Sequence, residues 1–205
     1  MAVPVWFTEV LDRELRPWLT LSEDQIFSLY THYSLLERWN EKISLTSVEP
    51  GPELVIRHYC ESLFLASHLG SEPGERVADL GSGAGFPGVP LAVYHPQCHV
   101  FLIESVQRKA VFLREATRHL PNIEVLGGRA EDVQSAFDWI VSRAVNPGDV
   151  LKNIPSLAPK VGLLLSERGL GQIKSRQGIA WSEPVRLPWG DRKFFVIGST
   201  WNNSL

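Results

Sequence analysis

The sequence predicts an α/β fold in which a mostly parallel, Rossmann-like sheet follows an N-terminal helical extension. From Arg76 onward, short apolar runs alternate with helical segments, and a glycine-rich turn follows the first of these runs. Strands and helices that alternate in this way form parallel sheets with right-handed crossovers. A third observation is the β-rich run at residues 192–201, which predicts a C-terminal antiparallel strand pair.

The first 70 residues are expected to form helices. Ser22 and the three acidic or amide residues after it predict a helix N-terminus. The apolar residues that follow recur at three- and four-residue spacing and predict one buried stripe: Ile26, Leu29, Tyr33, Leu35, Leu36 and Trp39. A further helix is expected from about Glu53 to Leu69. The turn-rich residues 70–75 then divide an extension (1–70) from the main domain (71–205).

The main domain contains five short apolar runs that predict parallel strands. These runs cover residues 77–80, 99–104, 123–126, 139–142 and 161–166. The clearest helix between them is expected at 107–119, and a strand near 180–187 is expected to pair with the terminal run. A dinucleotide-binding sheet would need a second βαβ half, which this pattern lacks, so a dehydrogenase is disfavoured.

Composition indicates a globular protein without a membrane segment. Apolar residues make up 44% of the 205 residues and charged residues 21%, so a packed core is expected. No apolar run approaches the roughly 18 residues that a membrane span requires. The first residues also lack the basic stretch of a signal peptide. We therefore expect a cytoplasmic protein with no membrane partner.

Charge and cysteine content restrict the chemistry further. Cys60 and Cys98 lie in no ligand-like spacing, so two buried free thiols are expected and no metal site. The net charge of −3 does not indicate a nucleic-acid-binding protein. A local basic face would still allow RNA binding, because affinity depends on the phosphates that are neutralised locally.

The stretch "VADLGSGAGFPG", residues 77–88, fits two kinds of cofactor site. Gly83, Gly85 and Gly88 match the dinucleotide fingerprint, which would make the chain an NAD(P)-dependent oxidoreductase. Asp79 with Gly81, Gly83 and Gly85 instead resembles the nucleoside-binding loop of S-adenosylmethionine (SAM) methyltransferases. A non-catalytic SAM- or RNA-binding module is the third possibility that the sequence leaves open.

Two acidic residues bear on this choice. Glu104 ends the second predicted strand, where its carboxylate would accept hydrogen bonds from ribose hydroxyls in either cofactor. Asp79 precedes the loop, where it would repel a pyrophosphate but attract the ammonium group of SAM. We therefore predict SAM as cofactor, with Gly81, Gly83 and Gly85 against its methionine part and Phe86 as a wall of the site.

With these features in place, the chain resembles the RsmG (GidB) family of small-subunit ribosomal RNA guanine-N7 methyltransferases. The similar segments are "ERWNEKISLTS" (37–47), "VIRHYCESL" (55–63), "DLGSGAGFPGVPLA" (79–92), "ESVQRKAVFL" (104–113), "GRAEDV" (128–133), "SRAV" (142–145) and "DRKFFVI" (191–197). Ser44 stands where the family prefers Asn, Glu61 where it has Asp, and "SERG" (166–169) where it commonly has a Lys-Gly pair.

The resemblance implies a class I SAM-dependent methyltransferase fold and methylation of guanine N7 in 16S ribosomal RNA. Guanine N7 carries a lone pair and no proton, so no general base is expected. The resemblance assigns Ala130 and Glu131 to adenine contacts and Arg143, at the end of the fourth strand, to positioning of substrate or cofactor. It implies RNA contacts among seven residues: Arg57, His58, Arg108, Lys109, Arg168, Arg192 and Lys193. The expected partner is 16S RNA or the small-subunit ribonucleoprotein, with no obligate protein partner.

Overall fold

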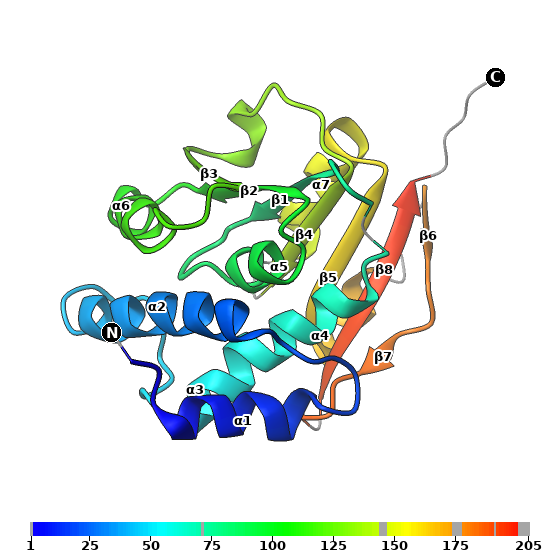
Figure 1. Ribbon diagram of the computed structural model, residues 1–205. Coiled ribbons are helices and arrows are strands. Elements are labelled where there is room, and N and C mark those ends of the chain that lie inside the picture. The colour runs from blue at the N-terminus through cyan, green and yellow to red at the C-terminus, as the bar shows by residue number, and fades with distance from the viewer. Residues whose placement is uncertain (1, 71, 144–146, 174–177, 191, 201–205) are drawn as a thin grey trace.

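The computed structural model describes residues 2–70, 72–143, 147–173, 178–190 and 192–200, with backbone only at 149 and 153–156. Among these residues, eight strands form one sheet in the order β3-β2-β1-β4-β5-β8-β6, and β7 pairs with β8 (Figure 1). The strands are β1 (Arg76–Leu80), β2 (His99–Glu104), β3 (Ile123–Gly127), β4 (Trp139–Arg143), β5 (Lys160–Ser166), β6 (Ile179–Trp181), β7 (Val185–Arg186) and β8 (Lys193–Thr200). Neighbouring strands from β3 to β5 are parallel, and β8 is antiparallel to β5 and β6.

The sheet confirms the predicted Rossmann-like fold and its five parallel strands. The terminal strand also pairs as expected, but β8 lies between β5 and the short strand β6. The single strand expected near 180–187 is instead two strands, β6 and β7. Pro184 lies between them, and proline has no backbone N–H to continue a hydrogen-bond ladder.

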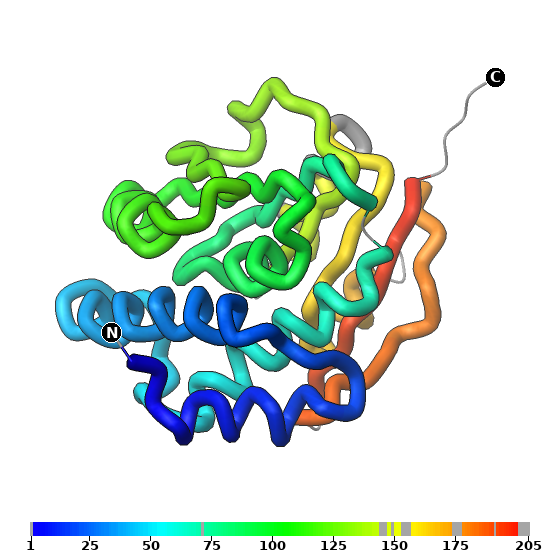
Figure 2. The backbone as a smooth tube through the Cα atoms, in the orientation of Figure 1, coloured from blue at the N-terminus to red at the C-terminus, as the bar shows by residue number. Residues whose placement is uncertain are grey.

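Helices cover both faces of the sheet. One face carries α1 (Val5–Leu15), α2 (Glu23–Asn40), α5 (Gly88–Tyr94) and α6 (Gln107–Ala116), and the other carries α7 (Pro147–Leu157) and α8 (Glu167–Ile173). Figure 2 shows the N-terminal helices, in blue and cyan, beside α5 in green. Core residues of the extension, such as Leu29 and Leu36, share one apolar cluster with Val89 of α5 and Val100 of β2. The N-terminal helices therefore pack against the helices and strands that follow them.

Helix α2 begins and packs as its sequence predicts. Ser22 is the N-cap, and its side chain accepts a hydrogen bond from the N–H of Gln25 while the Gln25 side chain accepts one from Ser22 N–H. This reciprocal pair is a capping box. Four residues of the expected stripe are buried, and Leu35 and Trp39 pack at its margin. His32 lies on the same buried face, with Nδ1 2.7 Å from the Tyr59 hydroxyl.

The helix expected from Glu53 to Leu69 is present, but its middle turn is wider than an α-helix. It consists of α3 (Pro52–Leu54), a π-helical segment η1 (Val55–Cys60) and α4 (Glu61–His68). The N–H of Glu61 bonds back to the carbonyl of Ile56, five residues earlier. Short π-helical segments are rare, occur mostly inside α-helices and are frequent at functional sites.

Cys60 and Cys98 are both buried and form no disulfide with each other. No helix in the described ranges is long and apolar enough to cross a membrane. Over the same residues, no group of three or more His, Cys, Asp or Glu side chains is arranged to hold a metal ion.

Candidate functional site

The glycine-rich loop begins where β1 ends, at the carboxyl edge of the sheet. The N–H groups of Gly81 and Ser82 both bond to the carbonyl of Ile103 in β2, at 2.9 and 3.2 Å. Gly81, Gly83 and Gly85 have φ values of 73°, 58° and 94°, in the region that glycine adopts most easily. Three such residues within five positions turn the chain sharply from β1 into α5.

The glycines of this loop differ in what surrounds them. A Cβ on Gly83 would meet only the Gly81 carbonyl, at 3.8 Å, so the space above Gly83 is open. A Cβ on Gly85 would lie 2.7 Å from Val89 Cγ2 and 3.0 Å from His32 Nε2. Gly88 likewise lies against Leu102 and Asp79. Gly85 and Gly88 are therefore required by packing, while Gly83 leaves room for a ligand.

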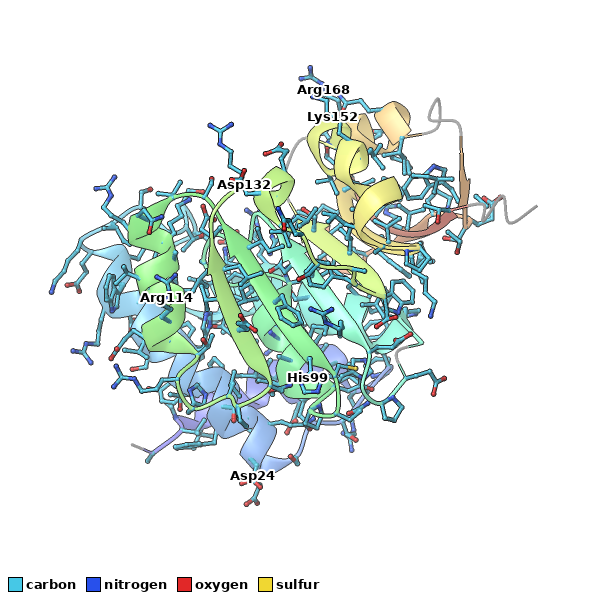
Figure 3. All side chains as sticks on the ribbon, turned by 90° about the horizontal axis from the view of Figure 1, so that it is seen from above. Asp24, His99, Arg114, Asp132, Lys152 and Arg168 are labelled. Carbon is cyan, nitrogen blue, oxygen red and sulfur yellow. The ribbon has the colours of Figure 1, made fainter. Side chains whose placement is uncertain are left out.

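A hollow of about 270 Å³ opens beside this loop. Its walls are Leu45, Thr46, His58, Gly81, Ser82, Gly83, Ala84, Phe86, Lys109 and Arg143. It lies at the carboxyl ends of the parallel strands, where open α/β sheets bind ligands. Figure 3 shows this edge of the sheet, with Asp132 after β3 and Arg168 after β5, opposite His99 at the start of β2.

Glu104 contacts the loop directly. Its carboxylate is only 6% exposed, and its Oε2 accepts a 2.8 Å hydrogen bond from Gly83 N–H. Its Oε1 accepts another of the same length from Val106 N–H. The carboxylate is thus held next to the open space above Gly83. A contact with a ribose from this position remains a prediction.

Asp79 lies behind the loop and is not among the residues that line the hollow. It is fully buried, and its Oδ2 accepts a 2.9 Å hydrogen bond from the N–H of Gly88, at the start of α5. Burial, with a smaller contribution from Glu104, raises the pKa of Asp79 to about 7. Its Oδ1 has no hydrogen-bond partner among the described residues. In this structure Asp79 anchors α5, and its contact with a ligand ammonium stays a prediction.

Arg143 connects two other side chains of the site. Its Nη1 lies 2.7 Å from His58 Nδ1, and its Nη2 lies 3.1 Å from Glu61 Oε2. Lys193 Nζ lies 2.5 Å from Glu61 Oε1, so one buried carboxylate pairs with two cations. The His58 ring stacks on Phe86 with centroids 4.8 Å apart. Burial and the nearby charges of Arg143 and Lys193 lower the pKa of His58 to about 3, which leaves the ring neutral.

The last residue of α2, Asn40, and Thr46 in the loop after it contribute to the site, and the sequence predicted no role for either. Asn40 Oδ1 accepts hydrogen bonds from the N–H groups of Leu45 and Thr46, and its Nδ2 donates to the Thr46 carbonyl. Thr46 Oγ1 lies 2.7 Å from His58 Nε2. Both residues fall within the segment "WNEKISLTS", whose similarity to the family was the one sign in the sequence that they belong to the site. In the sequence, Glu61 differs from the family pattern, and this difference alone predicts no role for it.

The other predicted cofactor residues lie nearby without lining the hollow. Ala130 and Glu131 form part of a short 3₁₀ turn, η2 (Ala130–Asp132), after β3. The carbonyl of Glu104 bonds to Gly128 N–H, which brings this turn close to the end of β2. Their adenine contacts stay predictions.

The predicted RNA-binding residues do not form one cluster in contact with the hollow. Lys109 and the partly buried His58 line it, and their RNA contacts stay predictions. Arg108 lines a second, larger hollow with Arg38, Trp39 and Lys42. Each of the other four has its own surroundings: Arg57 pairs with Glu53 at 3.1 Å, Lys193 pairs with Glu61, and Arg168 and Arg192 are exposed.

A solved structure shares the fold of this chain. A SAM-dependent methyltransferase from Aquifex aeolicus matches 74% of this chain and 94% of its own, with a TM-score of 0.60 and 19% identity. The likeness shows the Rossmann-like fold of this class of methyltransferase, with the glycine loop and Glu104 at the carboxyl ends of β1 and β2.

Sequence comparison identifies the family. The family model for rRNA small subunit methyltransferase G (GidB) matches residues 25–172. The ribosomal RNA small subunit methyltransferase G of Geotalea uraniireducens is 35% identical over 78% of this chain and 73% of its own length. The enzyme of the same name from Desulfitobacterium hafniense is 36% identical over 78% of this chain and 71% of its own. The chain belongs to the rRNA small subunit methyltransferase G family.

Proposed function

We propose that this protein methylates N7 of a guanine in small-subunit (16S) ribosomal RNA, with SAM as methyl donor. The observation that supports N7 best is the composition of the hollow: among the described residues that line it, none is a carboxylate. The one histidine there, His58, has both ring nitrogens engaged with Thr46 and Arg143. The described wall of the hollow therefore offers no free base, and N7 needs none.

The residues around the hollow fit SAM as the cofactor. The open space above Gly83 admits a ligand against the loop backbone, and the Glu104 carboxylate stands beside it to accept ribose hydroxyls. Ala130 and Glu131 follow β3 at the same edge and are proposed to contact adenine. Asp79 lies close behind the loop, where its negative form favours a cationic ligand over a pyrophosphate.

Alignment is the main contribution expected from the protein. Bound SAM supplies a methyl group on a positively charged sulfur. With SAM bound, transfer of its methyl group to the N7 lone pair would form a C–N bond, break the C–S bond and move the positive charge to the guanine ring. No proton is transferred, so the rate depends on holding the base in line with the methyl group. Phe86 and His58 form a stacked pair on the wall, and Arg143 is held by Glu61 as a positioning residue.

RNA binding is proposed along the surface next to the hollow. Lys109 lies in its wall, and Arg108 on the same helix faces the second hollow with Arg38 and Lys42. These cations would contact phosphates, which position the RNA without selecting a base. Arg57, Arg168, Arg192 and Lys193 are proposed as additional contacts. The substrate is 16S RNA or the small-subunit particle, and no obligate protein partner is proposed.

The proposal is tested by incubating the protein with labelled SAM and either small-subunit RNA or small-subunit particles. The modified nucleotide is then mapped and its chemistry identified. We expect one 7-methylguanosine. A methyl group on a ribose or an exocyclic amine would contradict the N7 assignment. Calorimetric SAM binding without any transfer to either substrate would indicate a non-catalytic module, and NADH binding without SAM binding would indicate an oxidoreductase.

A further inference from the structure

The hydroxyl of Thr46 lies in the wall of the hollow and is held by two hydrogen bonds. Thr46 Oγ1 is 2.7 Å from His58 Nε2, and it accepts a 3.1 Å hydrogen bond from the N–H of Val48. Thr46 lines the same hollow as the glycine loop. How these bonds are directed decides what the hydroxyl offers to a substrate.

Arg143 determines the direction of the bond between His58 and Thr46. A guanidinium group has only donors, so at the 2.7 Å contact Arg143 Nη1 donates and His58 Nδ1 accepts. The ring is neutral, because burial and two neighbouring cations lower the pKa of His58 to about 3. A neutral imidazole carries one proton, which must then be on Nε2. His58 therefore donates to Thr46.

The Thr46 hydroxyl is consequently left as a hydrogen-bond donor. Its oxygen has two acceptor positions, and these receive the hydrogen bonds of His58 and Val48. Among the described residues, its hydrogen has no acceptor. The oxygen is also fixed in place, since Asn40 makes three hydrogen bonds to the backbone of Leu45 and Thr46. The wall of the hollow thus carries one neutral, oriented donor.

Guanine has an acceptor that matches this donor. Along the edge that contains N7, guanine presents N7 and O6 as acceptors, whereas adenine presents N7 and an amino donor. We propose that Thr46 donates a hydrogen bond to O6 of the target guanine and so selects guanine over purines that lack this oxygen. This assignment rests on the proposed N7 methylation, because only a base that presents N7 to the cofactor places O6 on the same side.

The experiment compares two bases and three proteins. Small-subunit RNA is assembled by ligation so that the mapped target nucleotide is either guanosine or 2-aminopurine, which keeps N7 and the 2-amino group but lacks O6. Wild type, Thr46→Val and Thr46→Ser are compared for kcat/KM. Wild type is expected to methylate guanosine about tenfold faster than 2-aminopurine, which corresponds to one hydrogen bond. Thr46→Ser should retain this preference. Thr46→Val should methylate the two bases with kcat/KM values within about twofold of each other.

Calorimetric titration with SAM accompanies these rates, because valine also removes an acceptor for His58 and Val48. Thr46→Val is expected to bind SAM within about threefold of wild type, which would show that the variant is folded and the cofactor site intact. An undiminished guanosine preference in Thr46→Val would overturn the role of Thr46, and so would a large loss of SAM affinity. Equal kcat/KM values of the wild-type protein for guanosine and 2-aminopurine would also overturn it. Failure of wild type to methylate N7 of guanosine at all would instead overturn the proposed function.

Discussion

At the scale of single residues, the glycines of the loop show that one residue type serves two purposes. Gly83 faces open space, whereas Gly85 and Gly88 are enclosed by core side chains. The sequence pattern gives these positions equal weight in a cofactor site. Only the surroundings of each Cα separate a ligand-facing glycine from one that allows helix α5 to pack against the sheet.

Substitutions in the loop should therefore have different effects. Gly83→Asp is expected to lower SAM affinity by more than about 100-fold, because the side chain enters the hollow and its charge repels the carboxylate of SAM. The fold should be kept, since aspartate tolerates the left-handed conformation at modest cost. Calorimetry measures the SAM affinity, and circular dichroism checks that the fold is kept. Near-normal SAM affinity in this variant would contradict the placement of the cofactor.

Gly85→Ala provides the matched comparison. Its methyl group would press against Val89 and His32 at a residue with a φ of 94°. Overpacking and the strained φ together are expected to lower the free energy of unfolding by about 3 kcal/mol. Urea denaturation measures this loss, and an unchanged midpoint would show that the loop relaxes around the extra atom.

At the scale of elements, the helical run 52–68 positions the charged part of the site. Its extent was predicted, but its π-helical segment was not, because a π turn depends on contacts made in the folded protein. His58 and Glu61 lie in and just after this segment and both contact Arg143 at the end of β4. His58 and Glu61 precede Arg143 by 85 and 82 positions in the sequence, and they meet it because this helix packs on the sheet.

Glu61 is expected to be important for stability as well as for positioning. It is 1% exposed and pairs with both Arg143 and Lys193. Glu61→Gln keeps the shape but leaves the two cations without a balancing charge, so a loss of about 3 kcal/mol in unfolding free energy is expected. Glu53→Gln is the control, because its ion pair with Arg57 is exposed and is worth less than about 1 kcal/mol. If urea denaturation showed the same loss of unfolding free energy for both variants, the stabilising role of Glu61 would be contradicted.

At the scale of the whole molecule, three buried titratable groups make stability depend on pH in opposite directions. His32 and His58 each have a pKa lowered to about 3, mainly by burial. Between pH 6.5 and 3 the unfolded chain binds protons that the folded chain does not, so these groups reduce stability as pH falls. Asp79, with its pKa raised to about 7 by burial, binds a proton in the folded state first and increases stability as pH falls from 7 to 4.

Replacing Asp79 should therefore make the protein more sensitive to acid. As the pH falls from 7 to 5, the two histidines together are expected to lower the free energy of unfolding by about 4 kcal/mol. Asp79 is expected to raise it by about 2 kcal/mol over the same interval. Asp79→Asn keeps an acceptor for Gly88 N–H but loses the compensating proton. Its unfolding free energy in urea should fall about 2 kcal/mol further than that of wild type over this interval. Parallel pH profiles for the two proteins would show that Asp79 is ionised in the folded state.

The sequence by itself determined the order of the elements, the parallel strands, the capped start of α2 and the class of cofactor loop. These features depend on local periodicity, capping and turn chemistry, which operate between residues close together in the chain. The tertiary structure decided that β8 lies between β5 and β6, that Gly85 serves packing, and that Asn40 and His58 orient Thr46. These depend on burial and on contacts between distant segments, and the direction of a hydrogen bond at His58 follows only once Arg143 is seen beside it.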